Sequence, residues 1–145
     1  MNLGGVDYRE FLLDINQNKT GDGRFLSVDA IQIFLAGAGD LKGYPSALGT
    51  MIYDLDKNTD NWIVLDYSLG HGSGSGDMLA YIPNSLFNGG DYVYLYSKFG
   101  MHNPNTANFE EWAVRKPGPV VPLPAGVILG VLGLSAAGWR LRRFA

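Results

Sequence analysis

The sequence contains no cysteine, which excludes disulfide bonds, cysteine-based zinc sites and thiol nucleophiles. Histidine is scarce as well: the only two are His71 and His102, and neither has a partner at the spacing of a zinc site. Residues 1–116 contain no pattern of a long amphipathic helix. The 20 glycines, together with many aromatic and β-branched residues, instead indicate short strands joined by turns.

Positive charge is also scarce in most of the chain. Residues 1–116 contain 8 Lys and Arg against 14 Asp and Glu, a net charge of −6, whereas the last 29 residues contain 3 Arg and no acidic residue. An acidic body argues against nucleic acid as a partner, because neutralising phosphates requires a basic patch. The same charge is compatible with cation binding or with an ordinary solvated surface.

The first ten residues contain neither the basic nor the apolar region of a signal peptide. The C-terminal stretch described below nevertheless has the features of an exported protein. We therefore expect the sequence to be truncated at its N-terminus, with the mature domain beginning near Val6.

Short segments with β propensity, separated by turn signals, predict a mainly β fold. The clearest is 92–99, in which tyrosines alternate with mostly apolar residues. We expect an antiparallel β-sandwich or jelly-roll domain over residues 1–114, with a barrel as the main alternative. The predicted strands are 8–15, 28–35, 50–55, 62–67, 78–82, 92–99 and 109–114.

The C-terminal stretch differs from the rest of the chain. Residues 115–120 read as a linker, and residues 120–139 contain no charge. Because prolines fit poorly inside a helix, we expect a hydrophobic, membrane-spanning helix over about 124–139. The arginines that follow it would stay cytoplasmic, which places the acidic body outside. The alternative is a buried helix of a soluble domain.

The tail, residues 121–145, consists of Val121, Pro122, Leu123, Pro124 and Ala125, then the apolar stretch, then a basic end with Arg140, Arg142 and Arg143. This order resembles the PEP-CTERM sorting signal of Gram-negative bacteria, in its VPLPA variant. The resemblance implies that an exosortase, a membrane protease-transpeptidase, processes the tail and passes the protein to the cell surface. Leu123 stands where the commonest form of the motif has Glu.

Several segments of the body carry a second resemblance: 11–16 (FLLDIN), 26–34 (LSVDAIQIF), 53–56 (YDLD), 72–78 (GSGSGDM) and 109–114 (FEEWAV). Together they look like an uncharacterised extracellular β-domain that is found with such tails. This resemblance implies an extracellular location and supplies no activity.

Two acidic segments have the spacing of calcium-binding loops, whose oxygen ligands alternate along the chain. Either segment could hold calcium, and the alternative for both is a solvated polar turn whose side chains cap their own backbone. In the second segment a cation would also relieve the repulsion between three carboxylates. The first set is Asn18, Thr20, Asp22 and Asp29, with Gly23 at an EF-hand-like turn, and the second is Asp54, Asp56, Asn58 and Asp60.

Tyr92, Tyr94 and Tyr96 share one face of the predicted strand 92–99. If the residues between them fill the core, the tyrosines point outward and could stack on the sugar rings of an exopolysaccharide. The alternative is that they pack against a loop or a neighbouring sheet. The segment 70–77, which contains His71 and Ser73, matches no hydrolase or nucleotide-binding motif, and we expect a flexible surface loop there.

These features together predict an exported, surface-sorted, non-enzymatic protein of the bacterial envelope or extracellular matrix. In an intermediate state the C-terminal helix would span the inner membrane with the body in the periplasm, before the protein reaches the cell surface or the extracellular matrix. The expected partners are the membrane, the exosortase and an exopolysaccharide, with calcium as a structural ion. Two alternatives stay open: a secreted hydrolase whose site the sequence does not reveal, and a membrane-anchored protein that is never cleaved.

Overall fold

The computed structural model describes residues 1–70, 76–107 and 109–114, which belong to the compact unit Met1–Arg115. The predicted linker, sorting motif, membrane helix and basic end, and also His71 and Ser73, lie outside the described residues. Within the described ranges, no helix is long and apolar enough to cross a membrane. The elements are β1 (Asn2–Leu3), β2 (Val6–Asp14), η1 (Gly21–Arg24), β3 (Phe25–Ala36), β4 (Thr50–Asp54), β5 (Ile63–Asp66), η2 (Tyr67–Leu69), β6 (Met78–Pro83), η3 (Asn84–Leu86), β7 (Tyr92–Phe99) and β8 (Glu111–Val114).

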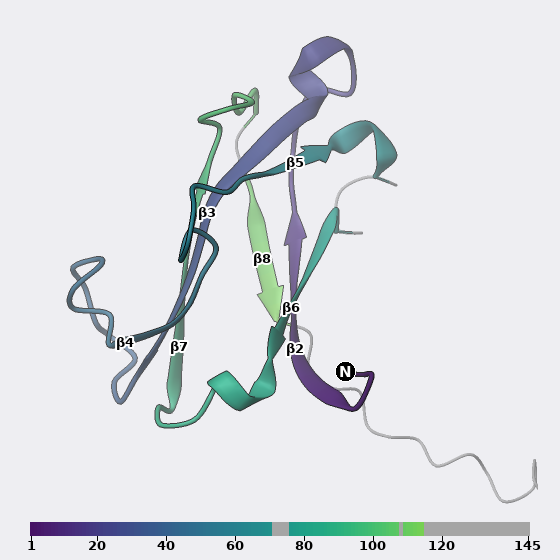
Figure 1. Ribbon diagram of the computed structural model, residues 1–145. Coiled ribbons are helices and arrows are strands. Elements are labelled where there is room, and N and C mark those ends of the chain that lie inside the picture. Colours follow the sequence, from purple (N-terminus) through teal and green to yellow (C-terminus); the bar gives the residue numbers. More distant parts are fainter. Residues whose placement is uncertain (71–75, 108, 115–145) are drawn as a thin grey trace, which may run out of the picture. The chain divides into compact units, whose positions relative to one another are not determined.

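Two antiparallel sheets are each organised around one long central strand (Figure 1). In the first sheet, β2 pairs with β6 on one edge and with β8 on the other, and its N-terminal end pairs with β1. In the second sheet, the 12-residue β3 pairs with β7 on one edge, while β5 and β4 share the other edge. Because β3 is rich in β-branched and large apolar residues, its sequence suits a central strand.

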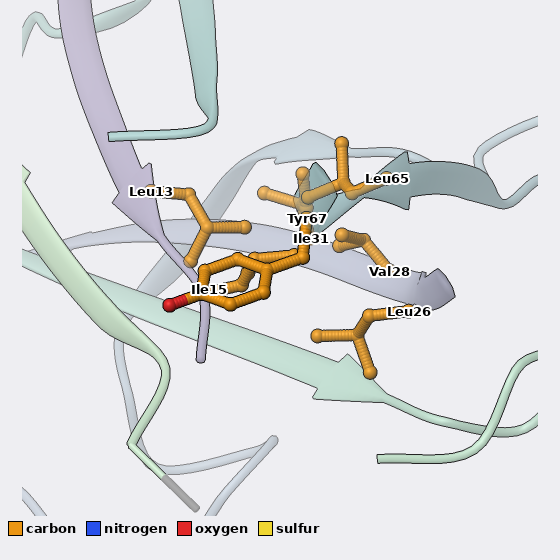
Figure 2. Close-up of a cluster of buried hydrophobic side chains, with 7 residues drawn as sticks. All are labelled: Leu13, Ile15, Leu26, Val28, Ile31, Leu65 and Tyr67. Atoms are coloured by element: carbon orange, nitrogen blue, oxygen red, sulfur yellow. The ribbon is translucent and has the colours of Figure 1, made fainter. Parts of the chain in front are cut away.

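The two sheets share one hydrophobic core. One cluster joins Leu13 of β2 to Val28 and Ile31 of β3, and Leu65 of β5 belongs to it as well (Figure 2). The indole of Trp112 on β8 also donates a hydrogen bond of 3.1 Å to the hydroxyl of Ser97 on β7 and so links the sheets. The prediction of a mainly β fold with antiparallel sheets is therefore confirmed, and the packing of the two sheets is consistent with a sandwich.

Asp29 occupies a β-bulge in β3. The register between β3 and β7 shifts between Val28 and Ala30, so Asp29 has no direct partner in the ladder. A bulge re-aims its extra side chain, and the Asp29 carboxylate accordingly contacts the residues that follow β7. The core-facing residues of β3 are even-numbered before the bulge and odd-numbered after it: Leu26 and Val28, then Ile31, Ile33 and Leu35.

The outer face of β3 is also buried, which a simple alternating pattern does not predict. Phe34 on this face is only 2% exposed, and Tyr44 from the loop 37–49 meets its ring edge-on with centroids 6.3 Å apart. The loop 37–49 therefore covers part of the outer face. The β7 residues opposite Gln32, Phe34 and Ala36 are Tyr96, Tyr94 and Tyr92, which consequently share this face.

We predict that Leu13→Ala lowers the free energy of unfolding by about 2–5 kcal/mol, because Leu13 is fully buried and its loss leaves a cavity between the sheets. The matched control is Leu79→Ala on the neighbouring strand β6, where the leucine is 42% exposed. It should cost less than about 1 kcal/mol. Urea unfolding measures both values, and equal losses would contradict the shared core.

Candidate functional site

Most buried polar side chains of the domain hydrogen-bond to one loop, residues 100–107, which we call the His102 loop. The described residues contain four buried polar or charged side chains, and three of these hydrogen-bond to this loop. Because a buried polar group is costly unless it is paired, such a concentration fixes the loop firmly. The three side chains are Gln17, Ser27 and Asp29.

Ser27 holds the start of the His102 loop. Its hydroxyl accepts hydrogen bonds from the backbone N–H groups of His102 at 3.1 Å and Asn103 at 3.0 Å. Gln17 holds the end of the loop, where its carbonyl oxygen accepts from the Thr106 N–H at 2.9 Å and its amide donates to the Asn105 side chain at 3.0 Å. Both ends of the loop are thus tied to the sandwich.

Asp29 fixes the imidazole of His102. One carboxylate oxygen accepts from the Met101 N–H at 2.7 Å, and the other lies 2.9 Å from His102 Nδ1. Burial acts to raise the pKa of Asp29, but the hydrogen bonds from His102, Met101 and Ser27 outweigh it, so the pKa lies below 3.8. Because an ionised carboxylate only accepts, Nδ1 carries a proton and Nε2 is the nitrogen left for other partners.

The imidazole of His102 also stacks on an indole. The rings of His102 and Trp62 are nearly parallel, at 9°, with their centroids 4.0 Å apart. Trp62 is 47% exposed, so much of the indole stays accessible to solvent. The stack extends the aromatic surface beside the His102 loop.

A second loop, which we call the Tyr44 loop (residues 37–49), is fixed by β7. The hydroxyl of Tyr94 accepts from the Leu41 N–H at 2.9 Å and donates to the Ala38 carbonyl at 2.8 Å. The ring of Tyr44 stacks on Tyr96 with centroids 3.9 Å apart. These contacts hold the Tyr44 ring at a defined place over the outer face of the second sheet.

The Tyr44 and His102 loops border a cleft of about 390 Å³. The Tyr44–Tyr96 stack forms part of its wall, and the Tyr44 hydroxyl donates a 2.8 Å hydrogen bond to the side-chain carbonyl of Gln32. The cleft thus combines aromatic, amide and charged groups. Its lining residues are Asp29, Ala30, Gln32, Tyr44, Asp56, Asp60, Tyr96, Lys98, Met101 and His102.

The three predicted tyrosines lie on one face of β7, but the loop 37–49 covers that face. Of the three, only Tyr96 lines the cleft, whereas the hydroxyl of Tyr94 hydrogen-bonds to the backbone of the Tyr44 loop. Tyr92 is 47% exposed and lies at the far end of β7, next to Gly39. All three tyrosines contact the Tyr44 loop, so packing against a loop, the alternative weighed for this stripe, describes the whole stripe.

The first predicted calcium segment is not assembled as a set of ligands. Asn18 and Thr20 precede the exposed Asp22 in η1, whereas the Asp29 carboxylate is buried in the bulge of β3 and engaged by the His102 loop. Over residues 1–70, 76–107 and 109–114, no three Asp, Glu, His or Cys side chains gather as a metal site.

The second calcium segment forms a turn that is closed by its own side chains. Asp54 accepts from the Asp56 N–H at 3.0 Å, and Asp56 accepts from the Asn61 N–H at 2.9 Å. Such carboxylate-to-backbone bonds are typical of Asx turns. Asn58 and Asp60 are exposed, and Asp60 is brought to the cleft together with Asp56.

The sequence singles out four residues of the lining, Tyr96 for a sugar and Asp29, Asp56 and Asp60 for calcium, but it does not predict that they share one cleft with Tyr44 and His102. Asp29 was predicted as a calcium ligand, and His102 only as an isolated histidine. One signal for the bulge is present in the sequence, since the apolar alternation of β3 changes phase at Asp29. The stacking of Tyr44 on Tyr96 and of Trp62 on His102 joins distant segments, and no local pattern encodes it.

A scan against protein-family models and searches of curated proteins and of solved structures find no significant match to this chain.

We predict that Asp29→Asn lowers the free energy of unfolding at neutral pH by about 1–3 kcal/mol, because a buried charged acceptor is lost. Since folding lowers the pKa of Asp29, its contribution is fully present above pH 3.8 and is lost as the pH falls through the folded-state pKa. The difference between the variant and the unsubstituted protein should therefore shrink in acid. Urea unfolding at a series of pH values measures it.

Asp77→Asn is a control for this pH series, because its effect on stability should change with pH in the opposite direction to that of Asp29→Asn. Burial and the nearby Asp14 raise the pKa of Asp77, although its carboxylate accepts from the Ile15 N–H at 2.9 Å. Because folding raises the pKa of Asp77, this group stabilises the fold below pH 3.8. Its contribution is lost as the pH rises through the folded-state pKa. Asp77→Asn should therefore gain stability relative to the unsubstituted protein as the pH rises. Effects that are independent of pH would contradict both assignments.

Proposed function

We propose that residues 1–114 form a non-enzymatic, saccharide-binding domain of an exported protein that is sorted to the bacterial surface or extracellular matrix. The observation that carries this proposal is the stacked pair Tyr44–Tyr96, which opens onto a polar cleft between two firmly held loops. The proposal moves the sugar site from the expected face of three tyrosines to this cleft.

The chemistry of the cleft suits a sugar ring. One face of a pyranose is lined by C–H groups that pack on aromatic rings, while its hydroxyls need hydrogen-bond donors and acceptors. Tyr44 offers an exposed ring, and Lys98 and Asp60 offer a donor and an acceptor at the same cleft. The volume of about 390 Å³ falls in the range of about 300–1,000 Å³ that is usual for small-ligand sites.

Pre-organisation also supports a binding role. Gln17, Ser27 and Asp29 fix the His102 loop, and Tyr94 fixes the Tyr44 loop, before any ligand arrives. A rigid cleft loses little conformational entropy on binding, which favours affinity.

A secreted hydrolase is the second candidate, and the Asp29–His102 pair is the observation that favours it. A carboxylate that orients Nδ1 of a histidine leaves Nε2 as a general base towards a cleft. In the cleft lining, however, no serine or threonine stands beside that nitrogen as a nucleophile. A serine-type hydrolase therefore lacks its nucleophile in this lining, and the Tyr44–Tyr96 stack is the observation that favours the binding role.

The C-terminal tail is the basis for the export and sorting part of the proposed function. The VPLPA motif, the apolar stretch 124–139 and the arginine end support insertion of the tail into the inner membrane, with the domain in the periplasm. Processing by an exosortase would then release the domain to the surface. The alternative is a protein that stays anchored by an uncleaved helix.

We predict that Tyr44→Ala weakens retention of the protein in a native gel containing polysaccharide by about tenfold, the equivalent of about 1.4 kcal/mol of lost stacking. Tyr92→Ala is the matched control, because Tyr92 is exposed to a similar degree, 47% against 45%, but lies outside the cleft. Equal retention of both variants, with melting curves that show them folded, would sink the cleft proposal. Release of shorter oligosaccharides that stops in His102→Gln would favour the hydrolase.

For the tail, we predict that replacing Pro122 and Pro124 together by Ala leaves the full-length protein in the membrane fraction of a host that contains an exosortase. The proline motif is the part that such a protease would read, whereas the apolar stretch alone suffices for insertion. Replacing Pro117 and Pro119 in the linker is the control and should leave surface release unchanged. Normal release of the Pro122 and Pro124 variant would contradict processing at the proline motif, whereas retention of the unsubstituted protein in the membrane would favour simple anchoring without cleavage.

A further inference from the structure

The cleft carries more negative than positive charge. Three carboxylates line it, from Asp29, Asp56 and Asp60, against the single ammonium of Lys98. The Asp29 carboxylate is engaged by Met101 and His102, whereas neither Asp56 nor Asp60 forms an ion pair among the described residues. The excess negative potential therefore extends into the space where a ligand would lie.

We propose that the cleft selects a saccharide with free amino groups, such as a polymer rich in unacetylated hexosamine. This inference rests on the proposed saccharide-binding function and adds the charge of the ligand. A protonated amine on the sugar would be attracted by the Asp56 and Asp60 carboxylates, and the rings of Tyr44 and Tyr96 favour cations as well. A uronic acid or a sulfated sugar would be repelled by the same groups.

The geometry separates the two kinds of recognition within the cleft. The Tyr44–Tyr96 stack and Gln32 lie on the second sheet and its covering loop, and they offer a surface for the ring of a sugar. Asp56 and Asp60 come from the turn between β4 and β5, at another part of the lining. A sugar ring bound on Tyr44 would therefore share one cleft with two carboxylates.

Two features favour an amino sugar over the side chain of a basic peptide. The cleft contains neutral polar groups, namely the Tyr44 hydroxyl and the Gln32 amide, which suit hydroxyl-bearing rings more than an aliphatic lysine stem. Its volume of about 390 Å³ also suits a short segment of a polymer. Binding of a basic peptide is the alternative that the test below distinguishes.

The test compares three oligosaccharides of equal length, made of glucosamine, N-acetylglucosamine and glucose, by titration calorimetry with the full chain. At a pH where the amine is protonated, the glucosamine oligomer should bind at least about tenfold more tightly than the other two. The preference should weaken as salt concentration rises, because exposed charges are screened.

Two variants assign the preference to the cleft. Asp60→Asn removes an exposed carboxylate from the lining but keeps a side-chain oxygen that accepts hydrogen bonds. It should lower the affinity for the glucosamine oligomer several-fold and the affinity for the glucose oligomer much less. Asp91→Asn removes an exposed carboxylate outside the lining and should change neither affinity. Lys98→Gln should raise the affinity for the glucosamine oligomer.

The outcomes separate this inference from the function on which it rests. Equal binding of all three oligosaccharides, lost in Tyr44→Ala, would overturn the selection for amines and leave saccharide binding intact. Binding of an oligolysine peptide with no binding of any oligosaccharide would overturn both. A preference for glucosamine that Asp91→Asn weakens as much as Asp60→Asn would overturn the assignment to the cleft, because general surface charge would then explain it.

Discussion

The carboxylate of Asp29 is the constraint on which the candidate site depends. It sits on an extra residue in the central strand β3, is only 3% exposed, and must therefore find partners inside the protein. It finds them in the Met101 N–H and the His102 imidazole, and so determines where the His102 loop runs. Trp62 then lies against the imidazole, and the border of the cleft follows from these contacts.

The same strand also positions the opposite border. The outer face of β3 carries Phe34 and Gln32, and these two side chains contact Tyr44 by an edge-on ring contact and a hydrogen bond. A single long strand thus places an aromatic loop over one part of its outer face and a polar loop beside its bulge. The core of both sheets packs against the inner face of β3, so the strand that carries the cleft is anchored in the sandwich.

Much of the fold could be predicted from local sequence patterns, and little of the site could. The alternation in 92–99 matches β7, and the prediction of β3 over 28–35 missed only its ends, since Phe25–Ala36 includes a change of phase at Asp29. The cleft joins residues far apart in the chain, such as Tyr44 with Tyr96, and local periodicity contains no information on such pairs. The two-residue β1 was too short to leave any pattern.

The central claim is that the ligand lies between the Tyr44 and His102 loops. The most direct measurement is a nuclear magnetic resonance titration with glucosamine oligomers that follows the indole N–H signals of Trp62 and Trp112. Trp62 lies beside the cleft through its stack on His102, whereas Trp112 donates its N–H to Ser97 within the sandwich. We predict a saturable shift of the Trp62 signal with an unchanged Trp112 signal. Saturable binding that leaves Trp62, Tyr44 and His102 unchanged would contradict the claim.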